Sequence, residues 1–410
     1  MSTAHVTAEA PLNGPPLGAA QDVLHRMMEL PSLADRYRAL VGSSVPDWHR
    51  VPILTKDDFR SAFADVLVWA RDQPHGAIVL GSGGTTAQPK LSLIPSGQLI
   101  DDIRQEWDPL TPDDVLVNYD TPGRLSASHN FYSALAHGAG ATTIPLGAVE
   151  EDQLSVWLDF IEQLGATALN ATQSRIAHLL EHCESIGRNP PALRKLLWNG
   201  EAYGNHALEI TRRMLPDAEL HGIYGSTETW VIGHNGPACA LDTFHLMPYQ
   251  YVELVDEMIV VTNLHSQCLN PVVRYNVGDR GEMMACRCGR AEPALRVIGR
   301  NDPQLKFLSI LVTPQEISQV ALADTEVSDA QVALFRHGRP DERIELRIKV
   351  TAGADATAVE RRVREAILTV VYRLGFEVQA HPEAFTVHVT DRLSVNQRSG
   401  KTPLLVKEDR

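Results

Sequence analysis

The sequence predicts an α/β protein of two domains, and three observations lead to this prediction. Apolar strands alternate with amphipathic helices over the first half of the chain, which is the pattern of an α/β fold. Beyond Asp242 consecutive strands follow one another through Gly and Asn turns, and a separate α+β unit begins after Asn301. We therefore predict a large α/β domain over residues 1–301, with mixed sheets, helices and a small β subdomain, and a small mobile α+β domain over residues 302–410.

The first predicted elements follow from an apolar run and a helix cap. Val51–Leu54 is an extended piece, and Thr55 is suited to cap a helix that has Asp57 and Asp58 in its first turn. Residues 76–80 form an apolar strand that leads into a loop rich in Gly and Thr. That composition is too irregular for a helix or a strand, so the loop is expected to have a function.

Hydrophobic periodicity places the remaining elements. In chain order the alternating part contains strand 115–117, helix 128–137, strand 141–144, helix 149–164, strand 168–170, helix 174–185, strand 195–198, a further helix and strand 221–224. The later part contains strands 251–254, 258–262, 296–298, 330–335 and 344–350, a helix over 357–374 and a strand over 384–389. The chain shows no internal repeat, which excludes repeat architectures.

The charge is acidic and unevenly distributed. The 410 residues include 37 Lys and Arg and 51 Asp and Glu, and the net charge of -14 argues against coating of nucleic acid or of an anionic membrane. Residues 1–301 carry 22 basic and 35 acidic side chains, whereas residues 302–410 carry 15 and 16. This change supports a domain boundary near residue 300, and it means that a phosphate-bearing ligand needs a local binding site.

Cysteine usage and the start of the chain indicate a cytoplasmic protein. Five scattered cysteines do not form a disulfide framework, so reduced thiols or a metal site are expected. Residues 1–21 lack the basic and apolar regions of a secretory signal, and no apolar run is long enough to span a membrane.

The stretch Gly81–Lys90 has the composition of a phosphate cradle. Its glycines let backbone N–H groups turn toward an anion, its hydroxyls add donors, and Lys90 supplies a positive charge. A flexible surface loop is the alternative interpretation. The stretch does not end as a P-loop does, and the segment Ser399–Thr402 is no P-loop either because Val395 stands where that motif needs glycine.

Four motifs occur in the order found in the acyl-adenylate-forming superfamily, which contains acyl-CoA synthetases, adenylation domains and luciferases. Residues 82–90 resemble its Ser/Thr-Gly-rich loop that ends in Pro-Lys, and residues 221–228 resemble its Tyr-Gly-x-Thr-Glu motif. Residues 274–281 resemble its Arg-Tyr-x-x-Gly-Asp motif. Residues 299–306 resemble its interdomain hinge, which places the domain junction near Asp302.

Other segments are similar to phenylacetate-CoA ligases within that superfamily. These segments are residues 51–60, 196–203, 286–290 and 398–410. The resemblance covers about residues 45–410, which is nearly the whole chain.

The resemblance implies that a carboxylic acid attacks the α-phosphate of ATP and that pyrophosphate leaves. The residues that would cradle the departing phosphates are Ser82, Gly84, Thr85, Thr86 and Lys90. Thr227 would donate a hydrogen bond to the α-phosphate, and Glu228 would hold Mg2+, a hard cation that suits a carboxylate shared with phosphate oxygens. A solvated loop carboxylate is the alternative for Glu228.

The resemblance also implies the contacts to the nucleoside. Asp279 would accept hydrogen bonds from the two ribose hydroxyls, and Tyr224 would offer a ring face to adenine, although filling of the core is its alternative role. The remaining residues implied in nucleotide binding are Gly200, Glu201, Ala202, Gly225 and Arg300.

Lys401 matches the lysine that bridges the carboxylate and the α-phosphate during adenylation in this superfamily. The preceding Arg398, Ser399 and Gly400 favour this interpretation over a merely solvated lysine near the chain end. The mechanism then implies rotation of the small domain about Asp302 to carry Lys401 to and from the nucleotide.

Four side chains could bind zinc, because thiolate and imidazole are ligands that structural Zn2+ prefers. They are Cys239, His245, Cys286 and Cys288, in the spacing Cys-x5-His followed by Cys-x-Cys. Plain buried thiols are the alternative, but some relatives of phenylacetate-CoA ligases carry a metal between similar segments, so the resemblance implies zinc. We expect Cys183 and Cys268 to be structural.

Two residues depart from the family pattern. Ala87 replaces a usual glycine of the phosphate loop, and Ser309 replaces the glycine of a loop that builds the pantetheine tunnel for the CoA step. The acyl acceptor therefore stays open between CoA, an amine, a carrier protein and none.

The acid pocket is expected at the same end of the α/β part as the nucleotide. Its predicted walls are residues 129–133, 170–173, 199–203 and 223–226. The aromatic side chains in or beside these segments are Phe131, Tyr132, Trp198 and Tyr203. Together with Asn and Gln they suit a flat aromatic acid that carries polar substituents.

We therefore predict ATP-dependent activation of an aromatic or heteroaromatic acid as its acyl-AMP, followed by CoA thioester formation. The alternative passes the adenylate to an amine, a carrier protein or a reductase in secondary metabolism, such as antibiotic biosynthesis. A non-catalytic nucleotide-binding regulator is the rival from another class, and the chemically suitable Lys90 and Lys401 argue against it. The expected partners are small molecules, neither nucleic acid nor membrane, and a homodimer stays open.

Overall fold

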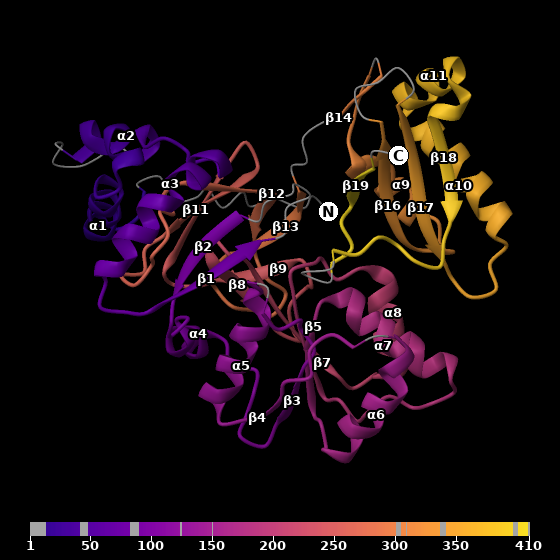
Figure 1. The fold of residues 1–410 in the computed structure, drawn as a ribbon, viewed down its shortest axis with the longest axis horizontal. Helices are drawn as coiled ribbons and strands as arrows, with labels where there is room; N and C mark the ends of the chain where they lie inside the picture. The colour runs from indigo at the N-terminus through magenta and orange to yellow at the C-terminus, as the bar shows by residue number, and fades with distance from the viewer. Residues whose placement is uncertain are drawn as a thin grey trace, which may run out of the picture. The chain divides into compact units, whose positions relative to one another are not determined.

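The computed structural model contains two compact units. The residues that it describes are 14–41, 48–82, 90–123, 125–149, 151–300, 305–308, 310–336, 342–396 and 401–408. The large unit lies within the chain up to Gly299, and the small unit consists mainly of Arg300–Arg410 (Figure 1). The predicted fold class, a large α/β part and a smaller α+β part, is confirmed.

One mixed sheet organises the large unit. Its eleven described strands have the order β10-β11-β12-β13-β9-β8-β7-β6-β5-β3-β4. The parallel strands are β3 (Val115–Asn118), β4 (Thr142–Ile144), β5 (Ala168–Ala171), β6 (Lys195–Asn199) and β7 (Glu219–Ser226). The others are β8 (Trp230–Asn235), β9 (Thr243–Leu246), β10 (Gln250–Val255), β11 (Met258–Asn263), β12 (Tyr275–Met284) and β13 (Ala294–Arg300). The consecutive strands after Asp242 thus continue the parallel part through the antiparallel pair β8–β9.

Helices flank the parallel part of this sheet. In chain order the first helices are α1 (Leu17–Met28), α2 (Pro31–Val41), α3 (Lys56–Trp69), α4 (Ile100–Glu106), α5 (Ala127–Ala139), α6 (Leu154–Gln163), α7 (Gln173–Ser185) and α8 (Asn205–Met214). Figure 1 shows α4 and α5 on one side of the parallel strands, with α6 and α7 on the other. Every residue of β5 is buried, as expected for a parallel strand that is covered on both faces.

The segment before the first long loop has the predicted cap. Thr55 and Asp58 form a capping box at the start of α3, in which each side chain accepts a hydrogen bond from the other residue's backbone N–H. Two strands, β1 (Ala77–Ser82) and β2 (Lys90–Pro95), then form an antiparallel pair that joins Ser82 to Lys90 in register. The predicted phosphate loop therefore connects the ends of a hairpin.

The small unit contains a four-stranded sheet with helices on one face and a separate two-stranded sheet. Its described elements are β14 (Leu305–Phe307), β15 (Ile310–Val312), α9 (Pro314–Leu322), β16 (Val327–Phe335), β17 (Arg343–Val350), α10 (Ala356–Val370), α11 (Tyr372–Ala380), β18 (Phe385–Val389) and β19 (Leu405–Glu408). The sheet order is β18-β17-β16-β19. Apolar residues of α10 and β17 share one core. The single helix predicted over 357–374 is wrong, because Val371 leaves helical geometry and separates α10 from α11.

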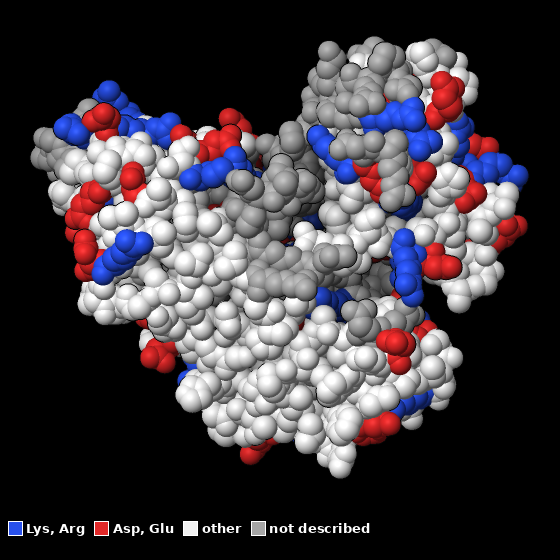
Figure 2. Space-filling view, viewed as in Figure 1, with Lys and Arg blue, Asp and Glu red and all other residues white. Residues whose placement is uncertain are grey.

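Charged side chains are mixed on the small unit. On the face drawn in Figure 2, Lys and Arg lie among Asp and Glu over this unit, in line with its nearly balanced charge. In the parts of the chain that the structure describes, no helix has the length and apolar character needed to cross a membrane.

Asp114 ties together the amino ends of three parallel strands. Its carboxylate, 1% exposed, accepts hydrogen bonds from Lys195 Nζ at 2.7 Å, from Thr167 Oγ1 at 2.9 Å and from the backbone N–H of Thr111 at 2.8 Å. Burial alone would raise the pKa of Asp114, but these hydrogen bonds, above all that of Lys195, lower it to about 2. The charged form is therefore the form that holds β3, β5 and β6 in register.

Replacement of Asp114 by Asn should destabilise the protein in a pH-dependent way. Because the folded-state pKa lies below the unfolded one, the stabilisation is present above about pH 4 and is lost as the pH falls toward 2. We expect a loss of about 2 kcal/mol in the free energy of unfolding at pH 7, shrinking below pH 4, measured by urea denaturation. Asp113→Asn, at the exposed neighbouring position, is the control, and an equal loss in both variants would contradict the assignment.

Candidate functional site

Polar segments meet where the parallel strands end. Neighbouring parallel strands point the same way, so the residues after β3, β5, β6 and β7 reach one edge of the sheet, where α/β proteins bind ligands. The structure brings two predicted segments to this edge. Gly200, Glu201 and Ala202 follow β6, and Thr227 and Glu228 follow β7.

Strand β7 ends in an irregularity that requires glycine. The pairing of β7 with β8 shifts register between Tyr224 and Gly225. A Cβ atom added to Gly225 would lie 2.2 Å from the carbonyl oxygen of Trp230, far inside contact distance. Gly225, which the resemblance implied in nucleotide binding, thus also has a packing role that shapes the turn bearing Thr227 and Glu228.

The carboxylate of Glu228 is buried among hydroxyl groups. Its residue is 4% exposed, and it accepts hydrogen bonds from the Tyr275 hydroxyl at 3.3 Å and from Thr227 Oγ1 at 3.1 Å. Burial raises the pKa of Tyr275, and the charge of Glu228 raises it further, so this phenol stays protonated as a donor. Glu228 is therefore an oriented acceptor within the fold and not a solvated loop carboxylate.

Asn270 links this turn to the hairpin that bears the phosphate loop. Its Nδ2 donates to the carbonyl oxygen of Glu228 at 2.8 Å, and its Oδ1 accepts from the backbone N–H of Leu93 in β2 at 2.9 Å. The side chain is buried, so both hydrogen bonds are shielded from water. Asn270 thereby couples two segments that are far apart in the chain.

Two further carboxamides support the same turn. Gln250 Nε2 donates to the carbonyl oxygens of Thr229 and Val231 at 2.8 and 3.0 Å, and Asn263 Nδ2 donates to that of Thr229 at 3.1 Å. Sequence analysis missed Gln250, Asn263 and Asn270. Isolated amides on strands and loops have no characteristic spacing that could reveal them.

Tyr224 and Asp279 meet across the sheet. The Tyr224 hydroxyl donates to Asp279 Oδ2 at 2.8 Å, joining the end of β7 to the middle of β12. The Tyr224 ring lies 5.5 Å from that of Phe244 between centroids, so one side of it has an aromatic neighbour. Both side chains are only partly buried, which leaves a ring and a carboxylate side by side for a ligand.

Glu201 holds the start of α7 and retains one free oxygen. Its Oε2 accepts from Ser174 Oγ at 2.6 Å and from the Ser174 backbone N–H at 3.3 Å, at the helix N-terminus. Among the described residues, Glu201 Oε1 is buried and has no hydrogen-bond partner. A buried acceptor without a partner is costly, which makes this oxygen a candidate contact for a ligand donor.

A buried polar network lies at the same strand ends, and sequence analysis missed its central residue, Asp120. Asp120, 3% exposed, accepts hydrogen bonds from Asn170 Nδ2 at 3.0 Å and from Asn199 Nδ2 at 3.4 Å. Asn170 Nδ2 also donates to Asn118 Oδ1 at 3.1 Å, and Ser128 Oγ donates to Asn199 Oδ1 at 3.0 Å. Asp120 lies two residues beyond a strand of a parallel sheet, and this position could have marked it as a candidate site residue.

The predicted aromatic walls of the acid pocket lie mostly in the core. Phe131 and Tyr132 are buried and make edge contacts to neighbouring rings, with Phe131 also touching Trp230. Trp198 is buried and packs edge-on against Tyr203, which alone of the four predicted aromatics is partly exposed. The network around Asp120 is therefore the polar feature of this region, with an apolar core behind it.

Several predicted residues lie outside the described parts. Gly84, Thr85 and Thr86 are not described. The hinge residue Asp302 and Ser309, which differs from the family pattern, are not described either. Only the backbones of Ser82, Lys90 and Arg300 are described, as strand residues. The roles implied for all of these stay predictions.

Lys401 belongs to the small unit and sits just before β19. Its carbonyl oxygen accepts a hydrogen bond from the backbone N–H of Asn396 at 2.8 Å. The side chain is partly exposed.

The four predicted zinc ligands converge. The ligating atoms of Cys239, His245, Cys286 and Cys288 all lie within 4.8 Å of one another, and His245 Nε2 lies 3.1 Å from Cys288 Sγ. Three of the four residues are buried. Burial raises the pKa of the Cys239 thiol to about 11, whereas the backbone N–H of Arg290 lowers that of Cys288. The donor set and its spacing fit a tetrahedral Zn2+ site.

Comparison with known proteins gives a family and a fold. The family described as AMP-binding enzyme matches residues 44–261, more than half of the chain. An indoleacetate–lysine synthetase of Pseudomonas savastanoi is 24% identical over 173 residues, which are 42% of this chain and 43% of that protein. The chain therefore matches less than half the length of this curated relative.

Solved structures share the architecture. A 2-hydroxyisobutyryl-CoA ligase in the postadenylation state, in complex with 2-HIB-AMP, has a TM-score of 0.70 at 18% identity, over 96% of this chain and 88% of that chain. The amide bond synthetase McbA from Marinactinospora thermotolerans has a TM-score of 0.55 at 17% identity, over 80% of this chain and 68% of that chain. At such low identity these likenesses show the fold.

Replacement of Gly225 by Ala should damage the turn after β7. The new methyl group would collide with backbone atoms of Trp230, which cannot move away as a side chain can, so we expect a loss of about 3 kcal/mol in the free energy of unfolding. Urea denaturation measures this loss. Gly97→Ala, at a position with nothing within 4 Å and an ordinary φ, is the control that should stay within about 1 kcal/mol of wild type. Wild-type stability of Gly225→Ala would refute the packing role.

Proposed function

The chain belongs to the AMP-binding enzyme family, and from that premise we propose that it forms acyl adenylates and that its substrate is an aromatic or heteroaromatic carboxylic acid. In the proposed reaction a carboxylate oxygen attacks the α-phosphorus of ATP. The new P–O bond gives the acyl-AMP, and the bond to pyrophosphate breaks. The protein's task in such a transfer is to position the reactants and neutralise charge.

The observation that supports this proposal best is the turn after β7 with its partners. It presents the Glu228 carboxylate and the Thr227 hydroxyl, and Tyr224, three residues before Thr227, contributes the Tyr224–Asp279 pair. We assign Thr227 to the α-phosphate, Asp279 to the ribose hydroxyls and Tyr224 to adenine. Gly200, Glu201 and Ala202 lie after the neighbouring strand, and the buried free oxygen of Glu201 suits a ligand donor there.

We also propose which charged side chains bind the metal ion and the phosphates during the reaction. Glu228 is an oxygen donor of the kind Mg2+ requires, and a bound Mg2+ would neutralise phosphate charge. Lys90, with the loop that contains Ser82, Gly84, Thr85 and Thr86, would hold the departing phosphates. Lys401 would bridge the carboxylate and the α-phosphate after the small unit moves about Asp302, and Arg300 would bind the nucleotide beside that hinge.

The acid is proposed to be aromatic or heteroaromatic and to carry a hydrogen-bond donor. Asn170 Oδ1, beside Asp120 at the strand ends, is a buried acceptor without a hydrogen-bond partner among the described residues. A buried polar site of this kind discriminates strongly against an analogue that lacks the matching donor, because its own groups are then left unpaired. An indole or amino-substituted ring would supply such a donor.

The acyl acceptor is proposed to be the thiol of CoA, with an amine as the second candidate. A solved structure of similar fold is that of a CoA ligase, which supports the first. The curated relative of higher identity is named a synthetase of indoleacetate and lysine, and another structure is an amide bond synthetase, which favours the second. Ser309 in place of glycine points the same way.

ATP–pyrophosphate exchange tests the proposed activation. We expect exchange with at least one acid among benzoate, phenylacetate, indole-3-acetate and phenazine-1-carboxylate, and faster exchange with those that carry a ring N–H or amino group. Lys401→Ala and Glu228→Gln should each lower kcat by about 100-fold or more, since each removes charge stabilisation from the transition state.

Exchange that is absent with the whole panel would refute the proposed function. Lys407→Ala serves as the matched control, because this lysine lies in β19 close to Lys401 and should leave exchange unchanged. Product analysis with CoA or with lysine and other amines then identifies the acceptor.

We further propose that Cys239, His245, Cys286 and Cys288 hold a structural zinc ion. Their convergence joins β9 and the connection before it to the turn after β12, so a bound ion would cross-link two parts of the sheet. Such an ion stabilises the folded state, because the unfolded chain offers no assembled site.

Metal analysis tests the zinc site. The purified protein should contain about one zinc per chain, and Cys288→Ser should lose it and melt several degrees lower. Cys183→Ser alters a buried thiol outside the cluster and should retain the zinc. Metal-free protein with wild-type thermal stability would refute the proposal.

A further inference from the structure

The segment that carries Lys401 is held at both ends by one buried side chain, that of Gln331 in β16. Gln331 is fully buried, with 0% of its surface exposed. Its Nε2 donates to the carbonyl oxygens of Ser394 and Pro403, each at 2.9 Å. Its Oε1 accepts from the Ser394 backbone N–H at 3.0 Å. One carboxamide therefore joins Ser394 and Pro403, the two residues that flank the segment containing Lys401. We call this pair of residues, held together by Gln331, the neck of the segment.

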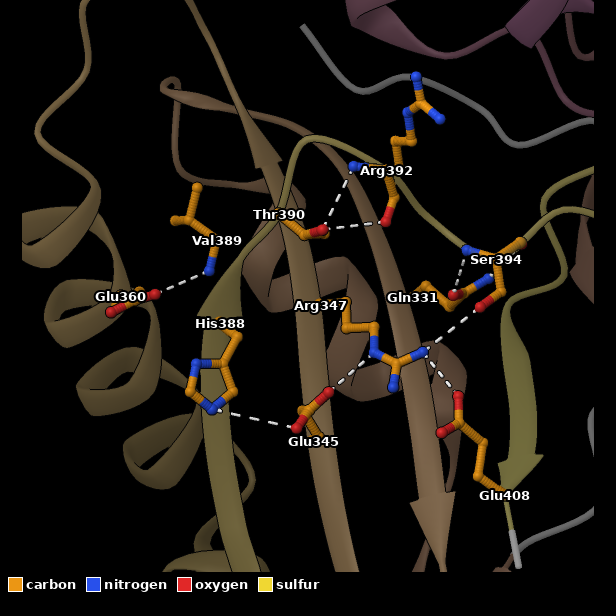
Figure 3. Close-up of polar contacts among 10 residues, drawn as sticks. All are labelled: Gln331, Glu345, Arg347, Glu360, His388, Val389, Thr390, Arg392, Ser394 and Glu408. Carbon is orange, nitrogen blue, oxygen red and sulfur yellow. Dashed lines mark hydrogen bonds and ion pairs between the residues drawn. The ribbon is translucent and has the colours of Figure 1, made fainter. Parts of the chain in front are cut away.

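Neighbouring contacts reinforce this neck. Figure 3 shows Gln331 facing Ser394, with Arg347 beside them on β17. Arg347 donates to Ser394 Oγ at 3.3 Å and to Glu408 Oε1 at 2.8 Å, so it contacts both the start of the segment and the end of β19. These groups bind the ends of the segment and leave the Lys401 side chain to other contacts.

Every polar atom of the Gln331 carboxamide has a hydrogen-bond partner, and these bonds fix the geometry of the neck. The Gln331 amide uses both of its N–H donors and its oxygen on backbone groups of the segment. A second layer follows inside the neck, where the Asn396 N–H donates to the Lys401 carbonyl at 2.8 Å. After the neck, the Val332 N–H donates to the Leu404 carbonyl at 2.9 Å and begins the pairing of β16 with β19. Lys401 is thus anchored on both sides.

We propose that Gln331 is a positioning residue for Lys401, and this proposal rests on the proposed function. The side chain of Gln331 would act through the backbone of the segment and not through contact with the nucleotide. Displacement of a catalytic group by about 1 Å costs on the order of 100-fold in rate. Loss of the Gln331 hydrogen bonds should therefore lower adenylation while the fold of the small unit persists.

The first test is hydrogen exchange, which needs no substrate. In Gln331→Met, of similar volume but without donors, the Asn396 amide should exchange at least about 10-fold faster, because its partner Lys401 is no longer held in place. The Asn396 amide is diagnostic since it does not bond to Gln331 itself. Gln319→Met, at an exposed position of α9, is the matched control and should exchange as wild type. Unchanged protection of Asn396 in Gln331→Met would overturn the proposal.

The second test is a double-mutant cycle on ATP–pyrophosphate exchange, with the best acid of the panel. Gln331→Met should lower kcat roughly 10- to 100-fold with little change in the KM for ATP. In the Lys401→Ala background the same substitution should have no further effect, because its action passes through Lys401. A full additional loss in that background would indicate general damage and overturn the proposal.

A further variant covers poor folding of Gln331→Met. Gln331→Glu keeps the volume and the acceptor for the Ser394 N–H, yet removes the donors to the two carbonyls, so it should show the same losses. Unfolding of both variants, judged by thermal melting, would assign Gln331 a purely structural role and also overturn the proposal. If no acid supports exchange, or if Lys401→Ala is fully active, the proposed function fails, and the Asn396 measurement still decides whether Gln331 holds the segment.

Discussion

The turn after β7 depends on one constraint, which is that its buried backbone carbonyls must find donors. They find them in three carboxamides, Gln250, Asn263 and Asn270. A turn that breaks the regular pairing of β7 and β8 would otherwise bury unsatisfied carbonyl groups, each costing about 1–3 kcal/mol. With them satisfied, Glu228 can be buried and still keep its carboxylate directed by Tyr275 and Thr227, and β2 with its phosphate loop is attached through Asn270. The proposed contacts of Thr227, Glu228 and the phosphate loop all depend on this arrangement.

The two edges of the parallel strands are specialised in opposite ways. At the amino edge Asp114 and Lys195 form an ion pair whose contacts hold neighbouring strands together. At the carboxyl edge Asp120 lies among carboxamides, and nearby oxygens of Asn170 and Glu201 are buried without a protein partner among the described residues. A group that is satisfied within the fold contributes to stability, whereas one that is left without a partner favours a ligand that completes it. This contrast places the candidate acid and nucleotide contacts at one edge.

How far the site could be predicted depends on whether a residue belongs to a local pattern. Tyr224, Thr227 and Glu228 belong to one recognisable motif of eight residues, 221–228. The four candidate zinc ligands stand out because cysteine is rare in this chain. Gln331, Asp120 and Asn270 have no such pattern. The hydrogen-bond partners of their side chains are 42 to 177 residues away in the chain, and a single amide or carboxylate gives no distinguishing signal until the fold supplies those partners.

By itself the sequence determined the α/β and α+β parts, the Thr55 cap and the residue types required for adenylate chemistry, because periodicity, capping and motifs are local. Only the tertiary structure decided that Gly225 is demanded by the Trp230 carbonyl, that Val371 divides a predicted helix, and that the neck around Lys401 closes on Gln331. The physical reason is the same in each case. Steric exclusion and the satisfaction of buried hydrogen bonds act between atoms that only the fold brings together.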